Sequence, residues 1–154
     1  MRLLFKPWAV KYLLRLWPPY WGMGIRIEYV SEDFRQIVVA MKFAWWNRNY
    51  VGTQFGGSLF AMTDPFYMLM LHKALEPDYF VWDKGACIEF VKPGTSKVRA
   101  RFEIDDAILE DIRRHTATGE KYFKDLSLDI VDASGEVVAR VKRTLYLRKK
   151  PHLR

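Results

Sequence analysis

The sequence predicts an α+β domain in which an antiparallel sheet wraps around one long central helix, with an extra N-terminal helix in front of it. Two observations predict this class. A long apolar helical pattern at 58–75 has strand-like stretches on both sides of it in the chain. Residues 97–104 alternate strictly between apolar and charged side chains, as half-buried antiparallel strands do. With 154 residues, no repeat and no linker-like stretch, the chain is expected to form a single such domain.

The first 21 residues are apolar but carry interspersed basic side chains. Residues 2–17 predict a helix that ends at Pro18, because proline cannot continue the hydrogen-bond ladder. Its apolar side chains spread almost all the way around, which favours burial against another element or subunit; contact with a membrane surface is the alternative. The basic residues argue against a signal peptide. No transmembrane helix is expected, because the longest apolar run, at about 55–71, is too short to span a bilayer and contains Asp64 and Pro65. We therefore expect a helical extension at 1–21 and one domain at 22–154.

The other elements follow from local patterns. Strands are expected at 24–31, 36–45, 85–91, 97–104, 121–131 and 136–147, and a short helix at 105–115. The last two strands should form a hairpin, since Gly135 between them can adopt the left-handed turn conformation. The short helix begins with acids and ends with Arg113 and Arg114, which suits the helix dipole.

Composition restricts the function classes. Half of the residues are hydrophobic, which argues against disorder, and the net charge of +7 favours an anionic partner. Nucleic acid is not expected, because the aromatic residues fall at apolar positions of helices and strands. The single cysteine, Cys87, excludes an internal disulfide, suits a cytoplasmic protein and is predicted to be a packed thiol inside a strand. Three scattered histidines show no ligand spacing, so neither a metal nor another cofactor is expected.

The stretch at 49–64, Asn-Tyr-Val-Gly-Thr-Gln-Phe-Gly-Gly-Ser-Leu-Phe-Ala-Met-Thr-Asp, holds the residues that could carry chemistry. Gly56 and Gly57 begin the apolar helix, so their backbone N–H groups could hold a carbonyl and stabilise an oxyanion formed from it. The other interpretation is a tightly packed helix entry. Asp64 could act as a base or nucleophile. Because Pro65 follows it, Asp64 could instead cap a kinked helix that restarts there.

This stretch resembles the active-site signature of hotdog-fold acyl-CoA thioesterases, in particular the phenylacetyl-CoA thioesterase (PaaI-like) type. The paired glycines of the signature match Gly56 and Gly57, its acid matches Asp64, and an asparagine near its start matches Asn49. The histidine of the signature is replaced here by Phe55. The order of the expected elements also resembles a hotdog domain, in which a sheet wraps a central helix.

The spacing between the glycine pair and the acid favours a dimer. Asp64 lies eight residues beyond Gly56, which puts the two about 12 Å apart along one helix. Both can reach one carbonyl only if two helices meet, for example when Gly56 lies near Asp64 of the partner subunit across a two-fold axis. The resemblance, which covers about residues 22–148, likewise implies a homo-oligomer, either a dimer or a dimer of dimers.

Further residues are candidates for contacts with the substrate. Phe55 can pack an acyl chain or close the pocket, but it cannot donate a hydrogen bond as a histidine would. Gln54 and Asn49 are the nearest polar substitutes, and Asn49 could equally be a turn residue that bonds its own loop. The phosphates of CoA require cations, which are otherwise solvated surface charges. The candidates, considered as a group, are Arg99, Arg101, Lys142, Arg143, Arg148, Lys149 and Lys150, of which Arg99, Arg101 and Arg143 are selected.

The sequence leaves three functions open. The leading hypothesis is hydrolysis of fatty or aromatic acyl-CoA thioesters, with Gly56 or Gly57 as the oxyanion donor and Asp64 of the other subunit as base or nucleophile. The alternative is a non-catalytic protein that binds acyl-CoA or a fatty acyl chain, because Phe55 replaces the expected histidine. A hotdog dehydratase or hydratase is the weakest candidate, since those enzymes resemble this fold but depend on a pocket histidine.

Overall fold

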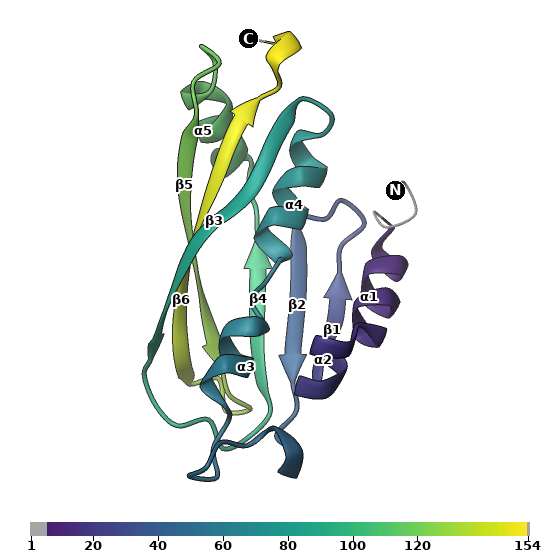
Figure 1. The fold of residues 1–154 in the computed structure, drawn as a ribbon, viewed down its shortest axis with the longest axis vertical. Helices are drawn as coiled ribbons and strands as arrows, with labels where there is room; N and C mark the ends of the chain where they lie inside the picture. The colour runs from purple at the N-terminus through teal and green to yellow at the C-terminus, as the bar shows by residue number, and fades with distance from the viewer. Residues whose placement is uncertain (1–5, 154) are drawn as a thin grey trace.

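The computed structural model describes residues 6–153 and contains one antiparallel sheet that bends around its central helices (Figure 1). Within those residues the sheet has six strands in the order β1-β2-β4-β5-β6-β3. Their bounds are β1 Ile25–Val30, β2 Gln36–Met41, β3 Tyr79–Phe90, β4 Val98–Glu103, β5 Tyr122–Val131 and β6 Val137–Lys149. The predicted fold class is confirmed.

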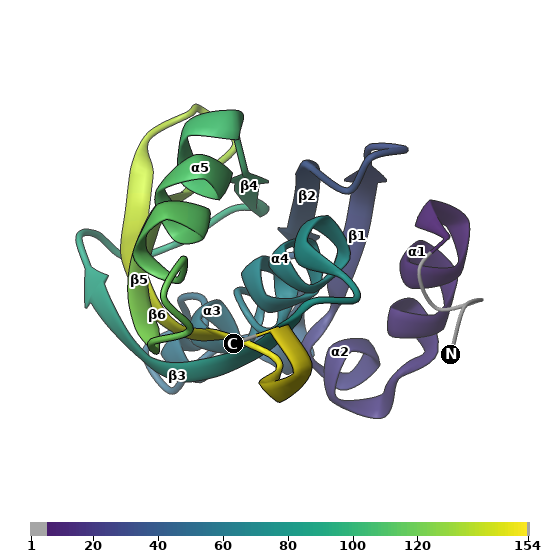
Figure 2. The ribbon, with the colours of Figure 1, turned by 90° about the horizontal axis from the view of Figure 1, so that it is seen from above.

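The helices lie on one face of the sheet and at one of its edges. Seen from above, the sheet curves around α3 and α4, while α1 and α2 lie beside β1 (Figure 2). The bounds are α1 Pro7–Leu16, α2 Pro18–Met23, α3 Gly56–Ala61, α4 Phe66–Leu75 and α5 Asp106–His115, with 3-10 turns η2 at Trp45–Asn47 and η3 at Pro151–Leu153.

The core forms between α4 and the concave face of the sheet. β4 confirms its predicted alternation, because Val98, Ala100 and Phe102 are buried and the residues between them are exposed. The ring of Phe102 packs against Phe66 and Tyr67 of α4, with ring centroids 5.0 and 5.1 Å apart. Burial raises the pKa of Tyr67 to about 12, and its hydroxyl donates to the backbone carbonyl of Ser127. These contacts fix α4, and the segment before it, against the sheet.

The single long helix expected at 58–75 is wrong, because the structure has α3 and α4 with a break between them. Proline has no backbone N–H and disrupts a helix interior, which explains the break at Pro65. The cap interpretation of Asp64 is also wrong: Pro65 is the N-cap of α4, and no side chain caps that helix. The Tyr20 hydroxyl donates to the backbone carbonyl of Asp64 and so satisfies one polar group of the break. Burial, followed by the Asp64 charge, raises the pKa of Tyr20.

The N-terminal helix is only half buried. The predicted end before Pro18 is confirmed, but a second helix, α2, begins at that proline, which suits a first helical position. Ala9 and Val10 are buried, whereas Trp8, Tyr12 and Leu16 are exposed. The part of the predicted helix before residue 6 lies outside the described part of the chain. None of the described helices has the length and apolar character needed to cross a membrane.

Two expectations about β3 are wrong. The strand begins at Tyr79 rather than at residue 85, and the Cys87 thiol on it is exposed instead of packed. Among the described residues β3 pairs only with β6, so its other edge lies at the margin of the sheet. Cys87 lies on the same face of β3 as Gly85 and Glu89, which are exposed too, so this face of the strand points to solvent.

Helix α5 confirms the predicted short helix with an acidic start and a basic end. The Asp105 side chain accepts a hydrogen bond from the Ile108 backbone N–H, and Arg113, Arg114 and His115 lie in the last turn. Asp111 connects this helix to β5 by accepting hydrogen bonds from Lys124 Nζ at 2.7 Å and from the Tyr122 hydroxyl at 2.8 Å.

Replacing Asp111 by asparagine is expected to lower the free energy of unfolding by about 1 kcal/mol at neutral pH. Lys124 and Tyr122 hold the pKa of Asp111 well below its usual range in the folded protein. The folded state therefore binds fewer protons than the unfolded state, and this stabilisation is lost as the pH falls below about 3.9, the ordinary value for Asp. Urea denaturation of both proteins at neutral and strongly acidic pH measures the effect. Equal deficits at both pH values would contradict it.

Candidate functional site

The glycine pair lies at the start of α3, where Phe55 is the N-cap residue. A side chain at either position would have to displace an aromatic ring: a Cβ on Gly56 would lie 2.8 Å from the Phe90 ring, and one on Gly57 would lie 2.5 Å from the Phe55 ring. Among the described residues, neither glycine donates its backbone N–H to another group. Two backbone donors are therefore available at the beginning of α3.

The loop before α3 is held by Asn49. Its side-chain oxygen accepts from the Thr53 backbone N–H at 2.9 Å, and its amide donates to Thr53 Oγ1 at 2.8 Å. Asn49 thus has the loop-bonding contacts that the sequence offered as one alternative. The same side chain lines a cavity of about 360 Å³, which also borders Gly56, Phe90 and Lys92.

Gln54 lies in the wall of this cavity and is almost fully buried. Its Nε2 donates to the carbonyls of Lys42 and Ser96, at 3.2 and 3.1 Å. Its Oε1 is buried and has no hydrogen-bond partner within residues 6–153. A buried acceptor without a donor is unfavourable by about 1–3 kcal/mol, and this oxygen has almost no surface that a molecule in the cavity could reach.

Asp64 follows α3 at its other end. Its side chain is 57% exposed, and Oδ2 lies 3.2 Å from Arg143 Nη2. Its second oxygen, Oδ1, has no hydrogen bond or ion pair to another described residue. No contact joins Asp64 to Gly56 within the described chain. One carboxylate oxygen is therefore anchored and the other is available to solvent.

The anchor is a buried arginine on β6. Arg143 is 5% exposed, and its Nη2 lies 2.6 Å from Asp83 Oδ2. Its Nε also donates to Asp83, at 2.9 Å, and its Nη1 donates to Thr63 Oγ1, at 3.0 Å. We call Thr63, Asp64, Asp83 and Arg143 the Arg143 cluster. It joins the break after α3 to strands β3 and β6.

The charged side chains of the Arg143 cluster are buried to different degrees. Burial raises the pKa of Asp83, the facing guanidinium of Arg143 opposes that rise, and the charge of Asp64 adds to it. Asp83 lies at a shift in the register between β3 and β6, and such bulges commonly redirect a side chain. The guanidinium is shared between two carboxylates, of which Asp64 is the exposed one.

Arg143 differs from the surface cation that the sequence suggested. Its buried guanidinium faces two carboxylates, which weighs against direct contact with a phosphate. Arg99 and Arg101 lie on the outer face of β4, with Nε atoms 2.8 Å from Glu28 Oε2 and 2.7 Å from Glu103 Oε1, respectively. The structure thus does not bring the three predicted arginines together.

Sequence reasoning missed Asp83 and Thr63 as neighbours of the acid. A signal was present for their partner, since Arg143 stands between Val141 and Leu145 in the inward-facing phase of β6. A charged side chain at such a position needs a buried partner. Within the described chain, no three His, Cys, Asp or Glu side chains lie together in a way that could hold a metal ion.

Comparison with solved structures supports the architecture. A protein of unknown function from Pseudomonas aeruginosa, called a probable thioesterase, is 20% identical, with a TM-score of 0.79 over 94% of this chain and 99% of that one. A thioesterase from Haemophilus influenzae is 18% identical, with a TM-score of 0.68 over 96% and 95%. A mutant of the phenylacetic acid degradation protein PaaI from Thermus thermophilus is 18% identical, with a TM-score of 0.59 over 84% and 97%. At these identities the likeness shows the hotdog fold.

Comparison of sequences gives the family. No curated protein matches the chain. A family model described as a domain of unknown function, DUF4442, matches residues 7–147. This match spans the N-terminal helices as well as the sheet, and the chain therefore belongs to the DUF4442 family.

Proposed function

We propose that this protein hydrolyses acyl-CoA thioesters at a site shared between two subunits. The observation that carries the proposal is the pairing of two available N–H donors, at Gly56 and Gly57, with an exposed, anchored carboxylate at Asp64. Two of the similar structures are named as a thioesterase and a probable thioesterase, which supports the same reaction class.

In the proposed reaction, the thioester carbonyl oxygen accepts hydrogen bonds from the N–H groups of Gly56 and Gly57. Asp64 of the partner subunit removes a proton from water as that water adds to the carbonyl carbon; alternatively, its free oxygen attacks the carbon and forms an acyl-aspartyl anhydride, which water then hydrolyses to the carboxylic acid and free Asp64. The two N–H groups stabilise the resulting oxyanion, and the carbon–sulfur bond breaks to release CoA thiol and the carboxylic acid. Arg143 keeps the carboxylate in one orientation.

The free edge of β3 supports the dimer. This strand is 12 residues long, and Phe80, Trp82 and Phe90 on it are 39%, 63% and 56% exposed. A long edge strand with exposed apolar side chains is a template for pairing with another chain. A second copy that pairs there would continue the sheet and bring α3 and the Arg143 cluster of each subunit near the two-fold axis.

Cys87 allows a direct test of that dimer, because it is the only cysteine in the chain and lies exposed on β3. If β3 pairs with its copy about its middle, nitroxide labels on the two Cys87 thiols are expected to lie on the order of 20 Å apart. Pulsed electron paramagnetic resonance measures the distance between the two labels. A monomer, or a dimer with widely separated labels, would contradict the shared site.

The cavity beside Gly56 is suited to the pantetheine arm of CoA. The side chain of Gln54 forms part of its wall and can pack against that arm. Asn49 lines the same cavity, so its contact with substrate and its role in the loop are compatible. We assign Arg99 and Arg101 as candidate partners of the CoA phosphates. The phosphates would have to replace the carboxylates of Glu28 and Glu103, with which these arginines pair.

The second candidate function is binding of acyl-CoA without turnover. Phe55 favours it, because an aromatic ring lies against Gly57 where the resembling thioesterases have a histidine. The two functions are separated by measuring binding and thiol release together, on acyl-CoAs of varied chain length and on phenylacetyl-CoA. Thiol release above the uncatalysed rate supports hydrolysis. Binding without any thiol release would replace the enzyme by a carrier or sensor.

Replacing Gly56 by valine is expected to reduce thiol release by roughly 100-fold, because the added side chain blocks the approach of the thioester to the backbone donor. The valine also meets the Phe90 ring, so the free energy of unfolding should fall by about 1–2 kcal/mol. Steady-state assays and urea denaturation check both effects. A Phe90→Ala change in the same chain should restore stability but not activity; restored activity would show that Gly56 serves packing alone.

A further inference from the structure

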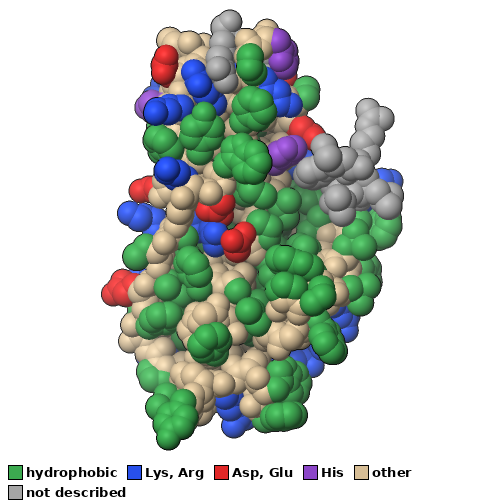
Figure 3. All heavy atoms as spheres, in the orientation of Figure 1, with side chains coloured by type: hydrophobic (Ala, Val, Ile, Leu, Met, Phe, Trp, Pro, Cys, Tyr) green, Lys and Arg blue, Asp and Glu red, His purple; other side chains and the backbone are tan. Residues whose placement is uncertain are grey.

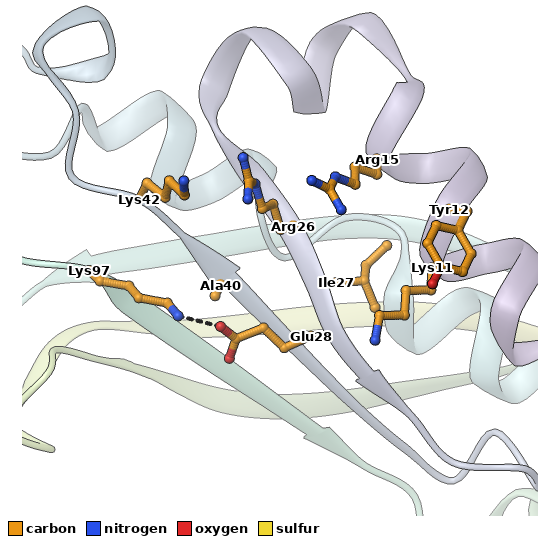
Figure 4. A pocket seen from close by; sticks show the side chains of 9 residues that line it. All are labelled: Lys11, Tyr12, Arg15, Arg26, Ile27, Glu28, Ala40, Lys42 and Lys97. Carbon is orange, nitrogen blue, oxygen red and sulfur yellow. Dashed lines mark hydrogen bonds and ion pairs between the residues drawn. The ribbon is translucent and has the colours of Figure 1, made fainter.

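A groove lined by cations runs between the N-terminal helices and the outer side of the sheet. Figure 4 shows its lining, to which α1 contributes Arg15 and β1 contributes Arg26. Two adjoining cavities, of about 460 and 650 Å³, share Arg15, Arg26 and Lys42. We call the set of basic residues that line them the cationic groove: Lys11, Arg15, Arg26, Lys42 and Lys97.

The charges of the cationic groove are mostly unbalanced. The one acid in its described lining is Glu28, whose carboxylate pairs with Lys97 and with Arg99. Burial favours the neutral form of Glu28, but these two cations overcome it and lower the pKa of the carboxyl. Within residues 6–153, the remaining four cations of the groove form no ion pair with an acid. The groove is therefore suited to bind negative charge.

Large apolar side chains surround the groove. We call the set Leu16, Trp21, Trp45 and Trp46 the apolar rim; their exposed fractions are 76%, 75%, 81% and 52%. Leu16, Trp21 and Trp46 line the same cavity as Arg15, Arg26 and Lys42. In the lower right of Figure 3, where Figure 1 places α1 and α2, hydrophobic side chains cover much of the surface and basic side chains lie at its edge.

The apolar rim has a fixed place in the fold. Asn47 is buried, and its Nδ2 donates to the backbone carbonyls of Met23 and Lys42, at 2.9 and 2.7 Å. These bonds hold the turn that carries Trp45 and Trp46 against the end of α2 and the end of β2. The row of exposed side chains continues along α1 through Trp8 and Tyr12, which lie one helical turn apart and precede Leu16 by two turns and one turn.

We propose that the cationic groove and the apolar rim dock this protein on the surface of a bilayer that contains anionic phospholipids. Tryptophan and tyrosine rings prefer the membrane–water interface, and basic side chains beside them attract anionic head groups. The phosphates would lie in the groove between Arg15, Arg26 and Lys42, while the rim enters the head-group region. Docking of this kind needs no helix that crosses the membrane.

Other occupants fit the surface less well. A second copy docked by the same face would bring two sets of unbalanced cations together, because a two-fold interface uses one patch twice. A small soluble anion would neutralise the groove but leave Trp8, Trp45 and the rest of the row in water. A bilayer surface satisfies the cations and covers the apolar side chains at the same time.

The test is sedimentation of the full-length protein with vesicles. Vesicles of phosphatidylcholine mixed with phosphatidylglycerol are expected to bind it, and pure phosphatidylcholine vesicles to bind it much more weakly. The Arg15→Glu/Lys42→Glu variant should bind the mixed vesicles roughly thirtyfold more weakly or worse, the loss expected for two cations near an anionic surface. The Trp21→Ser/Trp46→Ser variant should also lose binding, while keeping its preference for mixed over pure vesicles.

A matched control changes the same charge elsewhere. Arg113→Glu/Lys121→Glu alters two exposed cations near the other end of the fold and should leave vesicle binding unchanged. Equal losses in both charge variants would show that net charge, not the groove, attracts the vesicles, and would overturn the proposal. Failure of the wild-type protein to bind mixed vesicles would overturn it as well. So would strong binding of soluble glycerol 3-phosphate in place of vesicles, which would assign the groove to a soluble anion.

Discussion

Replacing Arg143 by methionine is expected to lower the free energy of unfolding by about 3 kcal/mol at neutral pH. The change leaves Asp83, a carboxylate with a side chain only 18% exposed, without its counter-charge. Because whole domains are stable by only about 5–15 kcal/mol, urea denaturation should show this loss clearly. The bond to Thr63 is lost at the same time, which adds to the effect.

The pH dependence gives the cause of this loss. Burial raises the pKa of Asp83, and removal of Arg143 takes away the charge that opposes the rise. Once the carboxyl is protonated it needs no counter-charge, so the difference between wild type and variant should shrink as the pH falls. The Arg143→Met/Asp83→Leu double variant should recover most of the stability, since it removes both charges. Wild-type stability of the single variant would show that the buried pair contributes nothing.

Replacing Asp64 by asparagine is expected to lower the rate of thiol release by about 100- to 10,000-fold while acyl-CoA binding stays unchanged. The amide keeps the size of the side chain but can neither remove a proton from water nor attack the thioester. Because Asp64 is more than half exposed, its pair with Arg143 is screened by water, and stability should change by less than about 1 kcal/mol. Asp64→Asn is therefore expected to act on rate with little effect on stability, whereas Arg143→Met lowers stability and also removes the group that orients Asp64.

Two results would contradict this role for Asp64. Equal rates for Asp64→Asn and wild type would remove the carboxylate from the mechanism. A loss of stability as large as that of Arg143→Met would make Asp64 a structural partner of the Arg143 cluster. The Asp64→Glu variant is a useful companion, since it keeps the charge and moves it by one methylene.

Most of the fold could be predicted from local patterns. The alternation at 97–104 defines β4, and Gly135, with a φ of 88°, adopts the left-handed turn conformation expected between the last two strands. The interruption between α3 and α4 was harder, because Thr63, Asp64 and Pro65 are compatible with both a kink and a cap. The break itself follows from Pro65, but its contacts with Tyr20 and Arg143 join residues that are far away in the sequence.

The candidate site was predictable only in part, because some of its contacts join residues that are far apart in the sequence. The glycine pair and the acid could be named from the sequence, because both lie within the motif at 49–64 at a fixed separation. Arg143 could be named only as one cation among several, since its partners Asp83 and Thr63 are 60 and 80 residues away along the chain. The exposure of Cys87 depends on which face of β3 the sheet turns towards solvent, which is set by the packing of the strands and helices with one another.

The shared active site is tested most directly by mixing two inactive subunits, Asp64→Asn and Gly56→Val. In a mixed dimer, one site combines the intact Gly56 of the first variant with the intact Asp64 of the second, while the other site carries both defects. Random exchange at equal amounts should therefore restore about a quarter of the wild-type rate of thiol release. A mixture whose subunits exchange, as followed with labelled protein, yet which stays as inactive as its two components, would contradict a site built from two chains.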